Sequence, residues 1–85
     1  MVINVIGIRK INFIDETSKK EIAGTKLFYS REPFSHEIDV IGCFADSVFI
    51  SSRIVLPKIS IGDTCELFYD FNGKKAILSS VMNLT

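Results

Sequence analysis

The side chains able to do acid–base or nucleophilic chemistry are few in this 85-residue chain. Its only histidine, His36, stands between Ser35 and Glu37. Serine, histidine and a carboxylate are the groups of a hydrolase triad, but a triad gathers residues from separate parts of a fold around one reacting atom. Adjacent residues rarely converge in this way. We therefore interpret His36 as a solvated loop side chain, and we predict no catalytic residues and no enzyme.

The two cysteines, Cys43 and Cys65, do not have the spacing of a metal site. Zinc ligands usually come in pairs two to four residues apart, and neither cysteine has a second cysteine or histidine at that distance. A disulfide is the alternative, but nothing in the chain marks it for export, so two buried free thiols are favoured. The sequence predicts no metal and no small-molecule cofactor.

Aromatic and basic side chains are better supplied, and they suggest binding. Almost all of the seven phenylalanines and two tyrosines fall in segments that favour strands. Rings facing outward from a barrel can stack on unpaired bases at about 1–3 kcal/mol each, and Lys or Arg beside them can neutralise phosphates. The candidate nucleic-acid-binding residues are Lys26, Tyr29, Arg31, Phe49, Arg53, Phe68, Tyr69 and Lys74. The alternative is that the rings form the core and the charges a solvated surface.

Composition limits this interpretation. Ten basic and ten acidic side chains cancel, so the chain has no long-range attraction for polyanions unless its charges segregate by face. Apolar residues make up 47% of the chain, a high share for so small a monomer, which suggests that some apolar surface meets a partner. A small core also gains stability from dimerisation, so we expect a homodimer.

Five strands must position these side chains, and the clearest pair is at the C-terminus. The dipeptide Asn72-Gly73 separates two apolar runs, which predicts a β-hairpin with a type I′ turn. Earlier strands are expected at Val2–Ile14, Ile22–Arg31 and Cys43–Ser52. A break in alternation at Arg9-Lys10 suggests a bulge that bends the first strand.

No helical period persists over ten residues, and at most one short turn is expected after Pro57. The prediction is therefore a single all-β domain over residues 1–85, a small five-stranded OB-like barrel with little or no helix. The apolar N-terminus lacks the features of an export signal, and no apolar run is long enough for a membrane span. We expect a cytoplasmic protein without membrane contact.

Several short motifs resemble a family of small proteins carried by phages, plasmids and conjugative elements of Gram-positive bacteria. The motifs are Val5-Ile6-Gly7-Ile8-Arg9-Lys10, Gly24-Thr25-Lys26-Leu27, Leu56-Pro57-Lys58-Ile59, Gly62-Asp63, and Tyr69 with Gly73-Lys74. The layout is also similar to the single-stranded-DNA-binding proteins of filamentous phages, which are dimers of a five-stranded barrel. The resemblance implies an OB-like fold, and it assigns no individual binding residue.

Two functions remain open at this point. One is binding of single-stranded DNA or RNA during replication or transfer of a phage or other mobile element. The other is a protein-interaction or assembly module that does not bind nucleic acid and pairs through its strand edges and aromatic side chains. The neutral charge favours the second.

Overall fold

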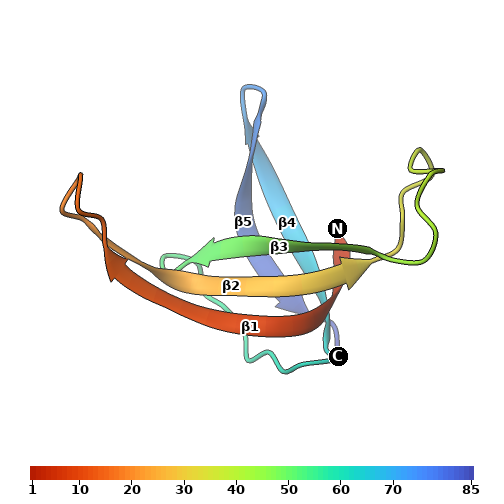
Figure 1. Ribbon diagram of the computed structural model, residues 1–85, viewed down its shortest axis with the longest axis horizontal. Coiled ribbons are helices and arrows are strands. Elements are labelled where there is room, and N and C mark those ends of the chain that lie inside the picture. The colour runs from red at the N-terminus through yellow and green to blue at the C-terminus, as the bar shows by residue number, and fades with distance from the viewer.

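The computed structural model describes every residue from Met1 to Thr85 and consists of strands joined by turns and loops, without a helix. The strands are β1 (Val2–Ile14), β2 (Glu21–Arg31), β3 (Phe44–Ser51), β4 (Thr64–Asn72) and β5 (Lys75–Asn83) (Figure 1). All pairings are antiparallel, and they form one sheet in the order β3-β2-β1-β4-β5. The prediction of an all-β, five-stranded protein is confirmed.

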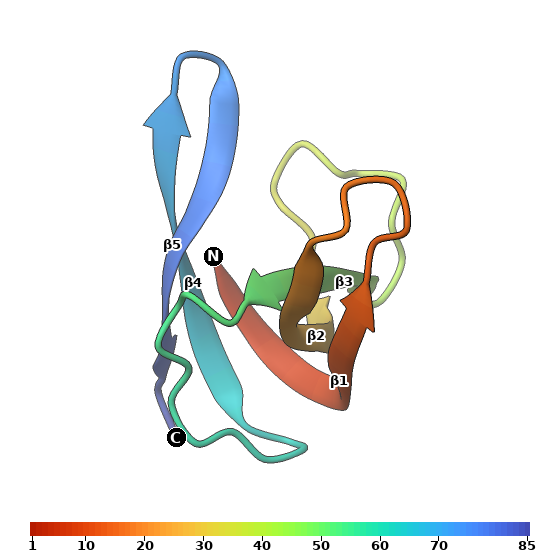
Figure 2. The ribbon, with the colours of Figure 1, turned by 90° about the vertical axis from the view of Figure 1, so that its left-hand side faces the viewer.

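The sheet is curled but open. Its two edges are β3 and β5, and no hydrogen-bonded pairing joins them, so the ring that a closed barrel needs is interrupted there. Figure 2 shows β1, β2 and β3 bending around one side of the molecule while β4 and β5 stand beside them as an arm. The OB-like barrel expected from the sequence is therefore not closed in this chain.

Strand β1 links the two parts of the sheet. It pairs with β2 from Asn4 to Ile14, but with β4 only over Val2–Asn4. The register shift lies between Val5 and Gly7, and not at Arg9-Lys10 as the sequence suggested. The alternation of apolar residues is interrupted at Arg9-Lys10 for another reason. No β1 residue after Val5 is buried, so this part of the strand lies outside the core and does not need an apolar row.

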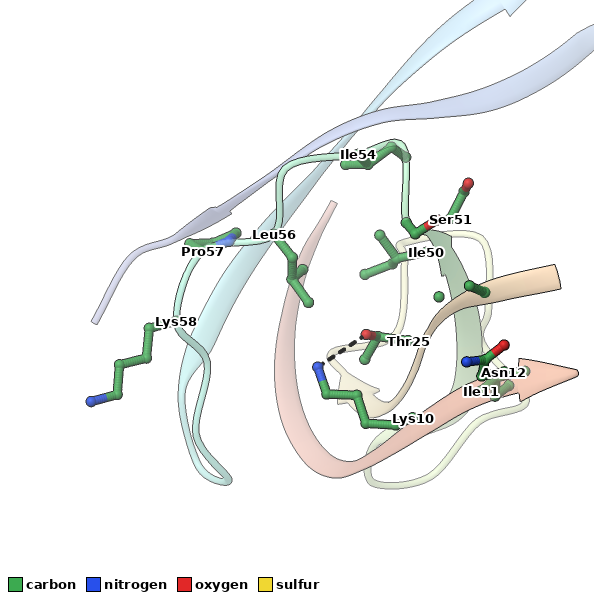
Figure 3. Close-up of a pocket in the computed structure, with 13 residues that line it drawn as sticks. Lys10, Ile11, Asn12, Thr25, Ile50, Ser51, Ile54, Leu56, Pro57 and Lys58 are labelled. Carbon is green, nitrogen blue, oxygen red and sulfur yellow. Dashed lines mark hydrogen bonds between the residues drawn. The ribbon is translucent and has the colours of Figure 1, made fainter. Parts of the chain in front are cut away.

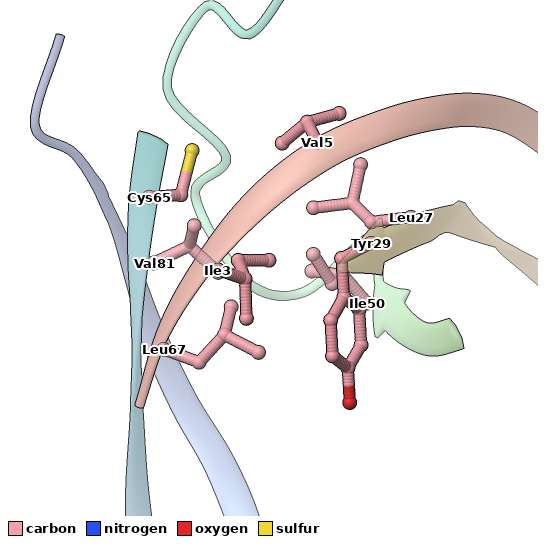
Figure 4. Close-up of a cluster of buried hydrophobic side chains, with 8 residues drawn as sticks. All are labelled: Ile3, Val5, Leu27, Tyr29, Ile50, Cys65, Leu67 and Val81. Carbon is pink, nitrogen blue, oxygen red and sulfur yellow. The ribbon is translucent and has the colours of Figure 1, made fainter. Parts of the chain in front are cut away.

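The core is small and draws on every strand. Figure 4 shows its side chains meeting between β1–β3 on one side and β4–β5 on the other. The eight buried hydrophobic residues are Ile3, Val5, Leu27, Tyr29, Ile50, Cys65, Leu67 and Val81. Of the two free cysteines only Cys65 is buried; Cys43 is exposed, contrary to expectation, because it precedes β3 at the end of a surface loop.

The C-terminal hairpin forms as predicted, but its turn differs. Asn72 pairs with Lys75, which makes Gly73 and Lys74 the two central residues. Gly73 has a φ of 65°, whereas Lys74 is not among the residues with positive φ. This is the pattern of a type II′ turn, which has glycine at its first central position. Glycine takes the one position that needs positive φ, and Asn72 stays in the ladder.

Candidate nucleic-acid interface

Strands β1, β2 and β3 present one face away from the core. Partners across an antiparallel pair lie on the same face, and Lys26 pairs with both Arg9 and Phe49. The next residue along β2, Leu27, points into the core, so this row points out. We call this surface the outer face. It comprises Gly7, Arg9, Ile11, Phe13, Ile22, Gly24, Lys26, Phe28, Ser30, Ala45, Ser47, Phe49 and Ser51.

Two aromatic rings on the outer face cover glycines on the neighbouring strand. A Cβ on Gly24 would lie 2.6 and 2.8 Å from ring atoms of Phe49, and a Cβ on Gly7 would lie 3.1 Å from Cδ2 of Phe28. The missing Cβ atoms thus let both rings approach the sheet closely. Phe49 keeps 43% of its surface exposed and Phe28 is half-buried. Each ring therefore retains surface for a ligand.

The charge on the outer face has a single sign. Its only charged residues are Arg9 and Lys26, which are cross-strand neighbours, and it carries no Asp or Glu. Neither is in an ion pair, and the Lys26 ammonium lies 5.5 Å from the ring centroid of Phe28. The neutral chain therefore does segregate its charges locally, with two cations beside two rings.

Tyr29, one of the predicted stacking residues, lies in the core. It is only 6% exposed, and burial raises the pKa of its phenol, with the Asp46 carboxylate adding to the effect. The outward member of the Phe28-Tyr29 pair is Phe28. Tyr29 therefore contributes packing and offers no ring surface for a base.

Arg31 is also buried, at 7% exposure. Its guanidinium donates to Oε1 and Oε2 of Glu37 at 2.7 and 3.1 Å, and lies 4.0 and 4.1 Å from the ring centroids of Phe34 and Phe44. A bidentate pair between two rings holds the guanidinium in place. Arg31 thus organises the loop that follows β2, and is not free to contact phosphate.

The Arg31–Glu37 pair predicts a pH dependence of stability. The Arg31 guanidinium, followed by the backbone amide of Phe34, lowers the pKa of Glu37 from about 4.5 to about 2. Because the folded-state pKa is the lower one, the stabilisation is complete above about pH 4.5 and is lost as the pH falls towards 2. Thermal melting of Glu37→Gln should therefore differ most from the wild type at pH 5 and above, and the difference should vanish near pH 2.

The control for this prediction is Glu32→Gln, an exposed neighbouring carboxylate that is in no ion pair. We expect its melting temperature to follow the wild type at every pH. A Glu37→Gln difference that is independent of pH would contradict the role of the ion pair.

The remaining predicted residues lie away from the outer face. Arg53 is exposed in the turn after β3, and Lys74 is at the tip of the β4–β5 hairpin. Phe68 and Tyr69 are on β4, with 38% and 36% of their surfaces exposed. The structure therefore brings together only Lys26 and Phe49 of the predicted set, and adds Arg9 and Phe28.

Comparison with protein-family models, curated protein sequences and solved structures found no match to this chain. No three His, Cys, Asp or Glu side chains gather where they would hold a metal ion. No helix with the length and apolar character of a membrane span is present.

Proposed function

We propose that the protein binds single-stranded nucleic acid on the outer face of β1–β3. The observation that carries this proposal is the pair of rings, Phe28 and Phe49, beside Arg9 and Lys26 on a face without carboxylates. Rings offer a surface on which any base can stack, and the two cations suit its phosphates. In an OB barrel the face of the second and third strands, with two loops, binds oligonucleotides, and here β2 and β3 carry Lys26, Phe28 and Phe49.

The spacing of the two rings favours a single strand over a duplex. Phe49 pairs with Lys26, two residues from Phe28, so the two residues are diagonal neighbours with backbone positions about 7–8 Å apart, and their rings lie over different glycines. Bases in a duplex rise by only about 3.4 Å per step, and their faces are already stacked. Two bases on these rings must therefore be separated from each other, which a flexible single strand allows.

The number of cations sets the expected salt dependence. Two phosphate contacts, to Arg9 and Lys26, give a slope of log K against log salt of about −1.4 for a single strand. Affinity should then fall about sevenfold between roughly 50 and 200 mM salt. A neutral chain with only two free cations on this face is expected to bind weakly, in the micromolar range.

The experiment is a fluorescence titration of a labelled oligo-dT of about 16 nucleotides with the full chain at low salt. We expect saturable binding that weakens with salt along this slope, and no comparable binding to a blunt duplex. Absence of binding at tens of micromolar protein, or equal affinity for the duplex, would contradict the proposal.

The resemblance to proteins of phages and conjugative elements supports replication or transfer as the setting. A parallel titration with oligo-U compares binding of RNA with binding of DNA.

A second candidate function is assembly through a second copy of the chain. The accessible surface is 6304 Å², whereas a compact monomer of 9.5 kDa exposes about 5,050 Å². The radius of gyration is 14.4 Å, against about 12 Å expected for this length. The excess of about 1,250 Å² is larger than the roughly 800 Å² that each partner buries in a standard interface.

The β4–β5 arm, Phe68–Ser80, is exposed over almost its whole length. Beyond Leu67 the two strands pair only with each other, and a lone two-stranded hairpin is marginally stable in water. Phe71 is 77% exposed and Ile77 is 45% exposed, and the edge of β5 is unpaired. An apolar hairpin with a free edge is suited to pairing with its counterpart in another chain.

Light scattering on a sizing column tests this second candidate. We expect a dimer, at twice the 9.5 kDa chain mass, that persists at high salt and is weakened by Phe71→Ser. Phe13→Ser is the matched control, because Phe13 is 52% exposed in the other hairpin. A monomer at high micromolar concentration would contradict the dimer, and a salt-insensitive dimer that ignores oligo-dT would leave assembly as the function.

A further inference from the structure

A cavity of about 600 Å³ lies on the inner face of the sheet, between the ends of β1–β3 and the loop that follows β3 (Figure 3). Its volume falls within the range of sites for small organic molecules, and exceeds what a bare ion needs. Ile50, Ile54 and Leu56 provide apolar wall. Among the thirteen lining residues are two lysines, Lys10 and Lys58, and no Asp or Glu.

Lys10, an exposed residue, supplies a cation at the wall of this cavity. Its Nζ donates a long hydrogen bond of 3.4 Å to Oγ1 of Thr25, and it is in no ion pair. Thr25 is 94% buried, at 6% exposure, and in Figure 3 both side chains point into the same space as Ile50 and Leu56. Lys58 points away. One wall of the cavity therefore carries the Lys10 ammonium and the Thr25 hydroxyl, and the wall that faces it is formed by the apolar side chains of Ile50 and Leu56.

We propose that this cavity binds a small organic anion, an apolar body with a single carboxylate or phosphate group. The anionic group would lie against the Lys10 ammonium and the Thr25 hydroxyl, and the apolar body against Ile50, Ile54 and Leu56. The cavity is open to solvent on one side, and its lining includes Lys10 and Lys58 but no carboxylate, so its charge favours an anion. Burial of the apolar body supplies most of the affinity, at about fourfold per methylene.

The polar groups of this site are separate from the proposed nucleic-acid surface, although Ile11, Gly24 and Ser51 of the outer face also line the cavity. Lys10 pairs with Thr25 in an inward row, whereas Arg9 pairs with Lys26 in the outward row beside it. The two ligands would therefore occupy opposite faces of the same three strands. Loss of one binding activity should leave the other unchanged.

The test is a titration of the isotope-labelled full chain followed by nitrogen–proton correlation spectra. The probes are octanoate and octyl phosphate, with octanol and inorganic phosphate as the matched neutral and headgroup-only compounds. We expect saturable shifts at the amides of Thr25, Ile50, Ile54, Leu56 and Lys58, and about fifteenfold weaker binding of hexanoate than of octanoate. Comparison of the two octyl anions shows whether carboxylate or phosphate is preferred.

Three outcomes would each overturn the proposal. Octanol could bind as tightly as octanoate, inorganic phosphate could reproduce the shifts, or the shifts could be confined to Thr64–Asn83. Lys10→Met keeps the length of the side chain and removes its charge, so octanoate should bind at least tenfold more weakly while octanol is unaffected. Lys20→Met, in the exposed β1–β2 turn, is the control and should change neither the octanoate affinity nor the octanol affinity. Unchanged octanoate affinity in Lys10→Met would also overturn it. Oligo-dT binding by Lys10→Met should equal that of the wild type, which separates failure of this site from failure of the outer face.

Discussion

Gly24→Ala is expected to lower the free energy of unfolding by about 3 kcal/mol, near the upper end for an overpacked site. Its Cβ would overlap the backbone carbonyl oxygen of Ile50 and lie 2.6 Å from the Phe49 ring. The ring can turn aside, but the carbonyl belongs to the β2–β3 ladder and cannot move without breaking it. Alanine would normally gain about 0.5–1 kcal/mol over glycine in a strand, which is too little to offset this overlap.

Gly7→Ala is the matched control for that substitution. Its Cβ would meet only side-chain atoms of Phe28, the nearest at 3.1 Å, and this ring can shift by a few tenths of an ångström. The gain in strand propensity and the small strain should then nearly cancel. Chemical denaturation of both variants measures the difference. Equal destabilisation by the two substitutions would contradict the account of how Phe49 packs over Gly24.

Phe28→Ala and Phe49→Ala are expected to weaken single-strand binding most. Each removes one ring from the outer face, and loss of a stacked base costs about 1–3 kcal/mol, or roughly 5- to 150-fold in affinity. Phe68→Ala is the control, because Phe68 has nearly the same exposure as Phe49, at 38% against 43%, but lies on β4. It should bind as the wild type does.

The cations should respond in a different way from the rings. Lys26→Met removes one phosphate contact, so the slope of log K against log salt should become shallower by about 0.7. Titration of the variants against the same oligo-dT at several salt concentrations gives both quantities. If Phe68→Ala weakens binding as much as Phe49→Ala, the binding site includes the β4–β5 arm and is not confined to the outer face.

The strands were predictable because their limits depend on local signals. Polar residues after Ile14 and the Asn72-Gly73 pair mark turns whatever the rest of the chain does. The limits predicted for the first strand, Val2 and Ile14, are the observed ones, and those of the third differ by one residue at each end. Closure of the sheet was not predictable in this way, since it depends on whether β3 meets β5, and no local residue pattern determines that.

The face on which each side chain lies is harder to obtain from the sequence. A shift of one residue exchanges the two faces of a strand, and β1 contains such a shift between Val5 and Gly7. The sequence shows that one ring of Phe28-Tyr29 must point outward, but register and burial decide that it is Phe28. Arg31 was missed as a structural residue because its partner, Glu37, is in a loop without a recognisable motif.

The proposed function requires that single-stranded nucleic acid lies on the outer face of β1–β3. Ultraviolet cross-linking of the full chain to oligo-dT, followed by peptide mapping, tests it most directly. We expect cross-links at Phe28 and Phe49, which are lost when an excess of unlabelled oligo-dT is present. Cross-links confined to Phe68, Tyr69 or Phe71, or none above the level of an unrelated protein, would contradict it.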